Sequence, residues 1–133
     1  MKRRYTNVLF GRPIEAEDVL LPGQRRGQTV QAYAPNLNGV DVLIGTFGRV
    51  NTCEVVLHLC DSPEAVTDKA TVRVVALTLQ DCEFYTFAFS PIADSAGREF
   101  YVWLESPDAM LSDGVTLFHY IENGELVLAQ HYP

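Results

Sequence analysis

The feature that most constrains this chain is that apolar residues recur at every second position through most of its length. A period of two is that of a β-strand, because successive side chains of a strand point to opposite faces of the sheet. No long stretch of the sequence has the period of a helix. The pattern therefore predicts an all-β protein. The apolar phase is carried by Val40, Val42 and Ile44, by Val55, Leu57 and Leu59, by Val72 and Val74, by Tyr85, Phe87 and Phe89, and by Phe100, Val102 and Leu104.

Clusters of turn residues divide this pattern into separate strands. The expected strands are 28–33, 40–47, 53–60, 71–77, 85–89, 98–105, 115–121 and 125–130, with one short helix near 76–81. The first segment, 6–21, is expected to add one or two edge strands. Eight or nine strands at this spacing are typical of an antiparallel two-sheet β-sandwich, and we expect the jelly-roll type. The chain 1–133 is expected to form one domain, with an N-terminal edge segment at 1–26 and a core at 27–131.

The dipeptide Asn123-Gly124 is the clearest turn signal. It favours a two-residue type I′ hairpin turn, in which both central residues need a positive φ. Such a turn would place Ile121 opposite Leu126 and His119 opposite Leu128. The register of the last two strands is therefore a specific prediction.

Several strands carry apolar residues on both faces. Tyr101 and Trp103 face away from the apolar phase of their own strand, and Phe118 and Tyr120 face away from Leu117. One face of each strand is expected to enter the core. The other face should be covered by a further segment or available to a partner.

The acidic balance of the chain narrows the range of partners. The formal net charge is −7, whereas nucleic acids and anionic membrane surfaces are bound by basic faces. The basic residues Lys2 to Arg4 and Arg25-Arg26 form two short clusters, which we interpret as solvated. No apolar run approaches the ~20 residues of a membrane helix. We therefore expect no nucleic-acid partner and no direct insertion into a membrane.

The cysteines Cys53, Cys60 and Cys82 are expected to be unpaired. An odd number leaves no complete disulfide framework. Cys53 and Cys60 fall in one strand, where seven residues separate them by ~23 Å, far beyond disulfide reach. Their odd separation also points them to opposite faces of the sheet. We interpret the cysteines as buried, inert thiols.

Signatures of catalysis are missing from the sequence. It has neither a nucleophile elbow nor a phosphate loop, and its three histidines lack metal-type spacing. Glu99 and Glu105 lie ~20 Å apart on one strand, too far for the two carboxylates of a glycosidase. Asp108 and Asp113 flank a loop, so a structural calcium ion stays open beside the simpler interpretation of turn-forming aspartates. We expect a protein that is not an enzyme and requires no cofactor.

Aromatic and polar residues together are the remaining candidates for a binding site. A sugar ring presents an apolar face of C–H groups and a rim of hydroxyls. It is bound by a flat aromatic side chain with hydrogen-bonding groups at the edge. The alternative, that Trp103 simply packs against a neighbouring segment, stays open. The residues that fit the sugar-binding role are Trp103 and Tyr101 as platforms, with Arg49, Asn51, Arg98 and Tyr120 as edge contacts.

Three stretches of the sequence resemble a known bacterial domain. They are GQTVQ at 27–31, GVDV and GTFGRVN within 39–51, and PIADSAGR followed by FYVWLESP within 91–107. With the strands between them they cover 27–121. The resemblance is to the jelly-roll, carbohydrate-binding-module-like domain attached to some bacterial membrane glycosyltransferases and related cell-surface polysaccharide proteins. It implies a non-catalytic accessory role at carbohydrate, and it carries no assigned sugar contacts over to this chain.

The sequence supports one leading hypothesis and two alternatives. The leading one is a non-catalytic, carbohydrate-binding-like domain that serves a cell-envelope glycan pathway. The second is an interaction module whose outer apolar face packs against an identical copy or an adjacent domain, and the third is a hydrolase. The expected location is cytoplasmic if the chain is complete, and extracytoplasmic if it was excised from a membrane protein.

Overall fold

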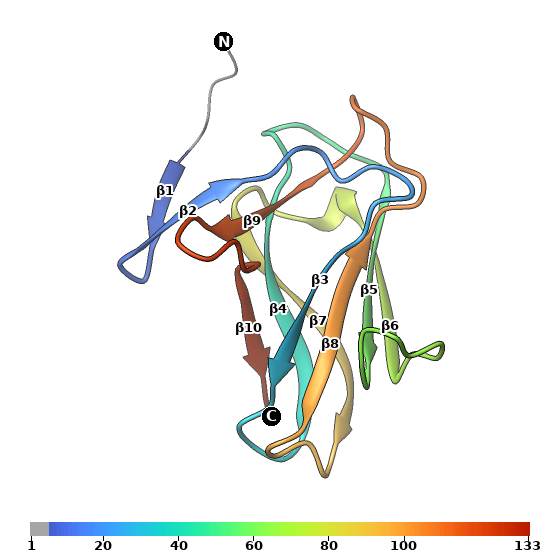
Figure 1. Cartoon of the computed structure of the whole chain (residues 1–133). Coiled ribbons are helices and arrows are strands. Elements are labelled where there is room, and N and C mark those ends of the chain that lie inside the picture. Colours follow the sequence, from blue (N-terminus) through green and yellow to red (C-terminus); the bar gives the residue numbers. More distant parts are fainter. Residues whose placement is uncertain (1–5) are drawn as a thin grey trace.

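The computed structural model describes residues 6–133, which form ten strands and one short 3₁₀ turn (Figure 1). The all-β prediction is confirmed, and the helix expected near 76–81 is the single turn η1. Among these residues, no helix has the length and apolar character needed to cross a membrane. The basic cluster Lys2 to Arg4 lies outside the described residues. The elements are β1 (Thr6–Leu9), β2 (Arg12–Ala16), β3 (Arg26–Gln31), β4 (Leu37–Gly45), β5 (Glu54–Cys60), β6 (Ala70–Val75), η1 (Ala76–Thr78), β7 (Glu83–Ile92), β8 (Glu99–Glu105), β9 (Thr116–Tyr120) and β10 (Leu128–His131).

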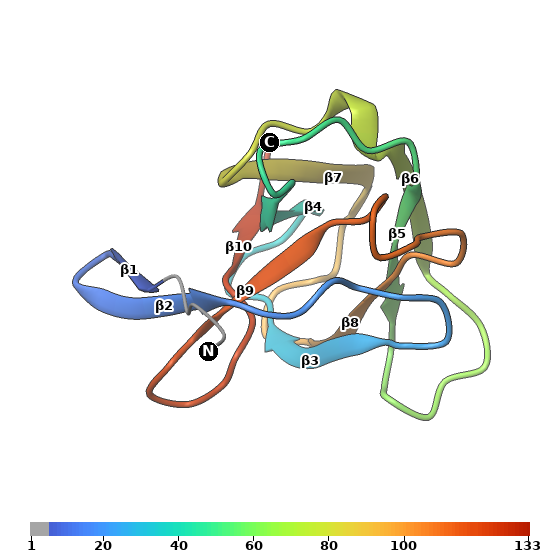
Figure 2. The ribbon, with the colours of Figure 1, turned by 90° about the horizontal axis from the view of Figure 1, so that it is seen from above.

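Two antiparallel sheets enclose the interior, as the view from above shows (Figure 2). One sheet has the order β1-β2-β9-β4-β10, with β7 also paired to β4, and the other has the order β3-β8-β5-β6. Strands β2-β9-β4-β7 facing β3-β8-β5-β6 form the two Greek keys of an eight-stranded jelly roll. The predicted sandwich is therefore confirmed. The first segment supplies both β1 and β2, and the remaining eight strands are those that the apolar pattern indicated.

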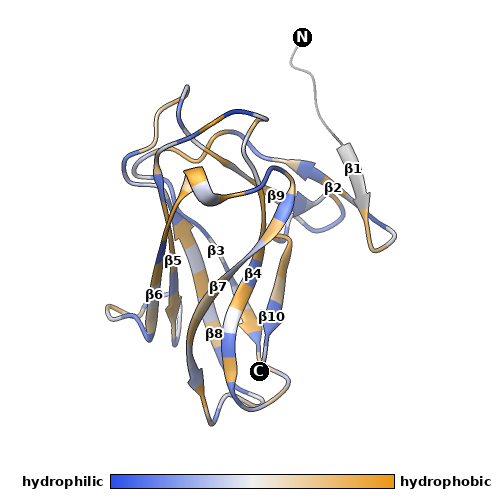
Figure 3. Cartoon of the chain, turned by 180° about the vertical axis from the view of Figure 1, so that it is seen from behind, coloured by the Kyte–Doolittle hydropathy of each residue, from blue (hydrophilic) through white to orange (hydrophobic). Residues whose placement is uncertain are grey.

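The core lies between the sheets. It is built from the alternate residues of each strand that the sequence pattern predicted to face inward. Alternation of hydrophobic and hydrophilic residues along the strands can be followed in Figure 3. Leu57, Phe87 and Phe100 are fully buried, each on a different strand. Since apolar area removed from water stabilises by roughly 25 cal/mol per Å², the burial of such large side chains is a major contribution to the stability of the fold.

The outer face of the six-stranded sheet carries a second, smaller apolar cluster. Leu117 belongs to the main core, whereas its neighbours Phe118 and Tyr120 pack on the opposite face. There they meet Ile14 of β2 and Leu43 of β4. Of the two outcomes that the sequence left open for the second face of this strand, covered by a further segment or available to a partner, the structure shows the first.

The hairpin between β9 and β10 differs from the predicted one. Gly124 has a positive φ of 72°, but Asn123 does not, so a type I′ turn is not formed. His119 pairs with Leu126, which shifts the register by two residues. The predicted pairing is wrong because β10 leaves β9 and pairs with the first half of β4. Tertiary strand pairing outweighs the local preference of the turn.

Candidate functional site

A cleft of about 370 Å³ opens between β3 and β10. These two strands belong to different sheets and do not pair with each other. The cleft therefore lies where one margin of the sandwich is left open, and its volume is in the range of small-molecule sites. The residues that line it are Gln28, Val30, Tyr33, Leu37, Val40, Leu128, Ala129 and Gln130.

The floor and rim of this cleft are formed by inward-facing residues of β3 and β10. Val30 of β3 and Leu128 of β10 pack against the main core. Gln28 and Gln130 lie two residues away from them, in the same phase, where an alternating strand would carry apolar residues. The interior therefore ends in two amide side chains at this margin.

At this margin the two sheets are joined by hydrogen bonds of side chains, because β3 and β10 do not pair through their backbones. The amide Nε2 of Gln130 donates to the carbonyl of Gln31 across the gap, at 2.7 Å. The Oε1 of Gln28 accepts the backbone N–H of Leu126 at 2.6 Å. Among residues 6–133, the Nε2 of Gln28 has no hydrogen-bond partner. The rim thus keeps hydrogen-bonding capacity for a ligand.

Tyr33 stands at the mouth of the cleft and is 73% exposed. Its ring centroid lies 4.8 Å from that of Tyr132, at an interplanar angle of 48°. The phenol of Tyr132 accepts the Tyr33 backbone N–H at 3.2 Å and donates to the Oε1 of Gln130 at 2.5 Å. An aromatic ring is therefore held beside the amide rim and remains open to solvent.

None of the eight residues that line the cleft is charged, although charged residues make up 20% of the chain. A charged ligand would lose its hydration here without gaining a counter-charge. The lining therefore selects for a neutral ligand with both apolar surface and hydrogen-bonding groups.

Trp103 and Tyr101 lie elsewhere, on the outer face of β8. The ring of His58 stacks on Trp103 with centroids 3.7 Å apart and planes within 6°, and the guanidinium carbon of Arg25 lies 3.9 Å from the indole centroid. Two groups this close cannot share one side of a ring, so both indole faces are covered. His58 and Trp103 are cross-strand partners on β5 and β8, and Trp103 stays partly exposed.

The polar groups around Trp103 are paired with one another. The Nδ1 of His58 lies 2.5 Å from Asp68, and its Nε2 lies 2.6 Å from Glu105. An ionised carboxylate only accepts hydrogen bonds, so this geometry suits an imidazole that donates from both nitrogens. Burial raises the pKa of Asp68, but hydrogen bonds from Thr71, His58 and Cys60 outweigh it and lower the pKa below its usual value. This outer face is a closed polar network around an aromatic ring.

Arg49 and Asn51 join two loops at one end of the molecule. Asn51 is 1% exposed. Its Nδ2 donates to the carbonyl of Thr46, and its Oδ1 accepts the N–H of Gly114 and the Nε of Arg49, each at 3.0 Å. Arg49 in turn donates to the carbonyl of Leu111 at 2.8 Å. These two predicted edge residues hold the β4–β5 and β8–β9 loops together.

Arg98 and Tyr120 lie apart from the other predicted residues. Arg98 precedes β8, at the end opposite the loop of Arg49, and pairs with Asp94 at 2.8 Å and Asp61 at 3.1 Å. Tyr120 belongs to the other sheet, is 8% exposed, and lies under the guanidinium of Arg12. The structure therefore brings together only two pairs of the six residues, and it does not gather them into one site.

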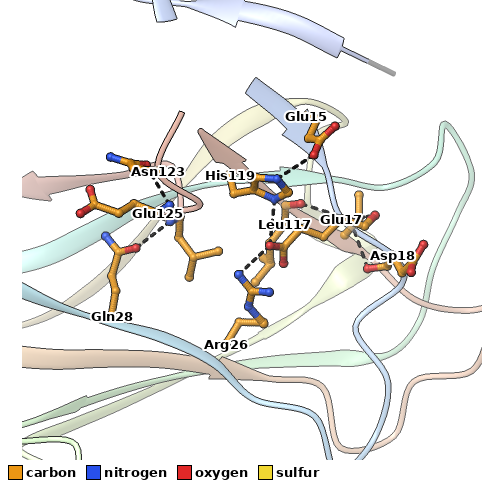
Figure 4. Close-up of polar contacts among 11 residues, drawn as sticks. Glu15, Glu17, Asp18, Arg26, Gln28, Leu117, His119, Asn123 and Glu125 are labelled. Atoms are coloured by element: carbon orange, nitrogen blue, oxygen red, sulfur yellow. Dashed lines mark hydrogen bonds and ion pairs between the residues drawn. The ribbon is translucent and has the colours of Figure 1, made fainter. Parts of the chain in front are cut away.

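A second histidine cluster lies between β2, β9 and β3 (Figure 4). The Nε2 of His119 contacts Glu15 at 2.9 Å, and its Nδ1 contacts Glu17 at 3.0 Å. Glu17 also pairs with Arg26 of β3 at 2.6 Å. The cluster links the two sheets through charged groups. Arg26 thus pairs with Glu17 and Arg25 lies over Trp103, while both side chains stay partly exposed to solvent, as the sequence-based interpretation expected.

The cysteines match the prediction in part. Cys53 and Cys60 are buried free thiols on opposite faces, and burial raises the pKa of each. Cys82 is exposed, contrary to the prediction, because it occupies a turn with a φ of 56° just before β7. Its pKa is raised as well, by partial burial and by the nearby Asp81.

The two loop aspartates, Asp108 and Asp113, both accept hydrogen bonds from backbone N–H groups. The carboxylate of Asp113 accepts from the N–H and the hydroxyl of Thr52 at 2.5 and 2.7 Å, and these bonds lower its pKa. Asp108 accepts the N–H of Glu54 at 2.8 Å. Within the part of the chain that the structure describes, no three or more His, Cys, Asp or Glu side chains are grouped to hold a metal ion. The calcium site left open by the sequence finds no support in this geometry.

Sequence reasoning missed the cleft. The signal that could have found it is the pair Gln28 and Gln130, each a polar residue in the inward phase of an otherwise apolar strand. No protein-family model matches this chain, and no curated protein shows significant sequence similarity to it. The candidate site therefore depends on its geometry.

Proposed function

We propose that this protein is a non-catalytic carbohydrate-binding domain whose sugar site is the cleft between β3 and β10. One observation carries the proposal: a concave, uncharged cleft combines an exposed aromatic ring with two primary amides. Sugars need this combination, because a pyranose has an apolar face and a rim of neutral hydroxyls.

Each part of the cleft has a chemical role in this proposal. Tyr33 stacks on the C–H face of a sugar ring. The Nε2 of Gln28 donates to a sugar hydroxyl, whereas Gln130, whose Nε2 and Oε1 already bond Gln31 and Tyr132, offers its second N–H and its second lone pair. Val30 and Leu128 exclude water from the apolar side of the ring. The resemblance to domains of cell-surface polysaccharide proteins favours a neutral segment of an envelope glycan.

The outer face around Trp103 is the weaker candidate for the same ligand. A sugar stacking on the indole would first have to displace Arg25 or His58. Displacing His58 would leave Asp68 and Glu105 without their shared partner. Exposing unpaired charges in this way opposes binding.

A titration followed by ¹H–¹⁵N NMR tests the proposal. The probes are neutral oligosaccharides, such as glucose, galactose and mannose oligomers, with uronic-acid oligomers as the anionic counterpart. We expect the neutral series to shift the amide signals of β3 and β10, with the His58–Trp103 region unchanged. No shifts at about 10 mM sugar, where even binding of about −4 kcal/mol would be visible, would contradict the proposal. Shifts centred on β8 would move the site to the outer face.

A further inference from the structure

Strand β7 is an unpartnered edge of the six-stranded sheet. It spans Glu83–Ile92, ten residues, and is the longest strand in the described chain. It pairs with β4 along one side (Figure 3) and with no strand on the other. Every second residue of β7 points its N–H and C=O toward that free side, where these groups have no partner strand.

The usual protection of such an edge is nearly missing here. Edge strands are commonly guarded by lysines, inward-pointing charges, prolines or bulges. Residues 84–92 contain no charged side chain. The one proline, Pro91, and the irregular register opposite Leu37 and Gly39 lie at the far end. The pairing of Glu83 to Ala88 with β4 is regular, so this part of the edge has no bulge that would hinder the addition of another strand.

Apolar surface accompanies the free backbone groups. Phe87, in the middle of β7, is fully buried, whereas Tyr85 and Phe89 in the same inward phase are only half-buried. Strand β6 is the nearest strand of the other sheet, but it pairs with β5 alone. A strand added beside β7 would cover these half-buried rings as well as the backbone.

We infer that the strand added to β7 is the β7 of a second copy of this chain. Two copies each carry a formal charge of −7, and their mutual repulsion favours contact through a surface that carries no acidic groups. The uncharged segment 84–92 meets this condition. Two identical strands in antiparallel pairing are self-complementary, and the resulting interface is closed by a two-fold axis. The dimer would have one continuous sheet running through both copies.

Sedimentation velocity over a concentration series tests this inference. We expect the wild-type chain to show a monomer–dimer equilibrium. Ala88→Lys places a positive charge on an exposed position at the free edge, opposite Gly39, and should raise the dimer dissociation constant by tenfold or more. Thr67→Lys adds the same charge in the exposed β5–β6 loop and should leave the dissociation constant unchanged. An unchanged circular dichroism spectrum confirms that each variant is folded.

Hydrogen exchange locates the interface. At concentrations above the dissociation constant, the free-edge amides of 84–88 should exchange at least tenfold more slowly than in dilute protein. A chain that stays monomeric at about 1 mM overturns the inference, since even binding of about −4 kcal/mol would give dimer there. A dimer that Ala88→Lys does not weaken, or one without protection in β7, overturns it too. These outcomes are independent of sugar binding, because β7 contributes no residue to the cleft.

Discussion

The cleft between β3 and β10 and the outer face around Trp103 both combine aromatic rings with polar groups, but they differ in what remains free. Around Trp103, two charged or polar groups cover the indole, and the imidazole of His58 is held between two carboxylates. In the cleft, Tyr33 is largely exposed and the amide nitrogen of Gln28 has no partner within residues 6–133.

The difference shows that an aromatic residue on an outward strand face is not by itself a binding platform. Trp103 is the residue that composition points to first, yet its neighbours use both of its faces. A binding site needs groups that the folded chain leaves unsatisfied, since each group already paired must be released before it can contact a ligand.

The largest effect that separates the two regions is expected for Trp103→Ala. The variant removes a ring packed between His58 and Arg25, and it should lower the free energy of unfolding by about 2 to 3 kcal/mol. Sugar affinity of the folded variant should stay unchanged. Urea unfolding and calorimetric titration measure the two quantities, and a loss of affinity with intact stability would reverse the assignment of the regions.

Asn51→Ala should have the next largest effect. Removing this buried amide leaves the N–H of Gly114 without its partner and takes away one of the two donors to the carbonyl of Thr46, which keeps the N–H of Arg49. The free energy of unfolding should fall by about 2 kcal/mol. Chemical denaturation measures the loss. Weaker sugar binding without destabilisation would instead support Asn51 as a ligand contact.

Tyr33→Ala should act on binding rather than stability. Loss of the stacking ring should weaken sugar affinity about tenfold, or about 1.4 kcal/mol. The free energy of unfolding should change by less than about 0.5 kcal/mol, because the side chain is largely exposed. Tyr33→Phe keeps the ring and should retain most of the affinity, whereas equal binding by all three proteins would exclude the cleft.

The smallest effect is expected from the pH dependence of Asp68→Asn. The folded-state pKa of Asp68 lies below its ordinary value of 3.8. Its ionised carboxylate therefore stabilises the fold above pH 3.8, and this contribution is lost as the pH falls through the folded-state pKa. The stability difference between wild type and variant should be present at neutral pH and shrink in acid below 3.8. Denaturation curves across this range measure it, and a difference that grows in acid would contradict the assigned direction.

The fold could be predicted because its main determinant is local. Period-two alternation assigns Phe87, Phe100 and their neighbours to one interior without knowledge of the strand order. The register of the last hairpin could not be predicted from Asn123-Gly124, because it depends on where β10 meets β4. That contact is set by the whole sheet.

The site was less predictable for the same reason. The sequence places Trp103 on an outward face, but not His58 and Arg25 against it. Those neighbours follow from the order β3-β8-β5, which brings distant segments side by side. The cleft likewise arises where β3 and β10 fail to meet. The inward-facing Gln28 and Gln130 mark a break in the apolar pattern of each strand, but neither strand alone shows that the two lie opposite each other.

The stack of Arg25, Trp103 and His58 gives the protein a built-in optical probe. Trp103 is the single tryptophan of the chain, and we expect the His58 imidazole, stacked 3.7 Å from it, to quench its emission. Fluorescence should therefore brighten when this face opens during denaturation and report local melting without an added dye. The same signal should stay silent when a ligand fills the cleft, so one cuvette measurement can distinguish unfolding from occupancy.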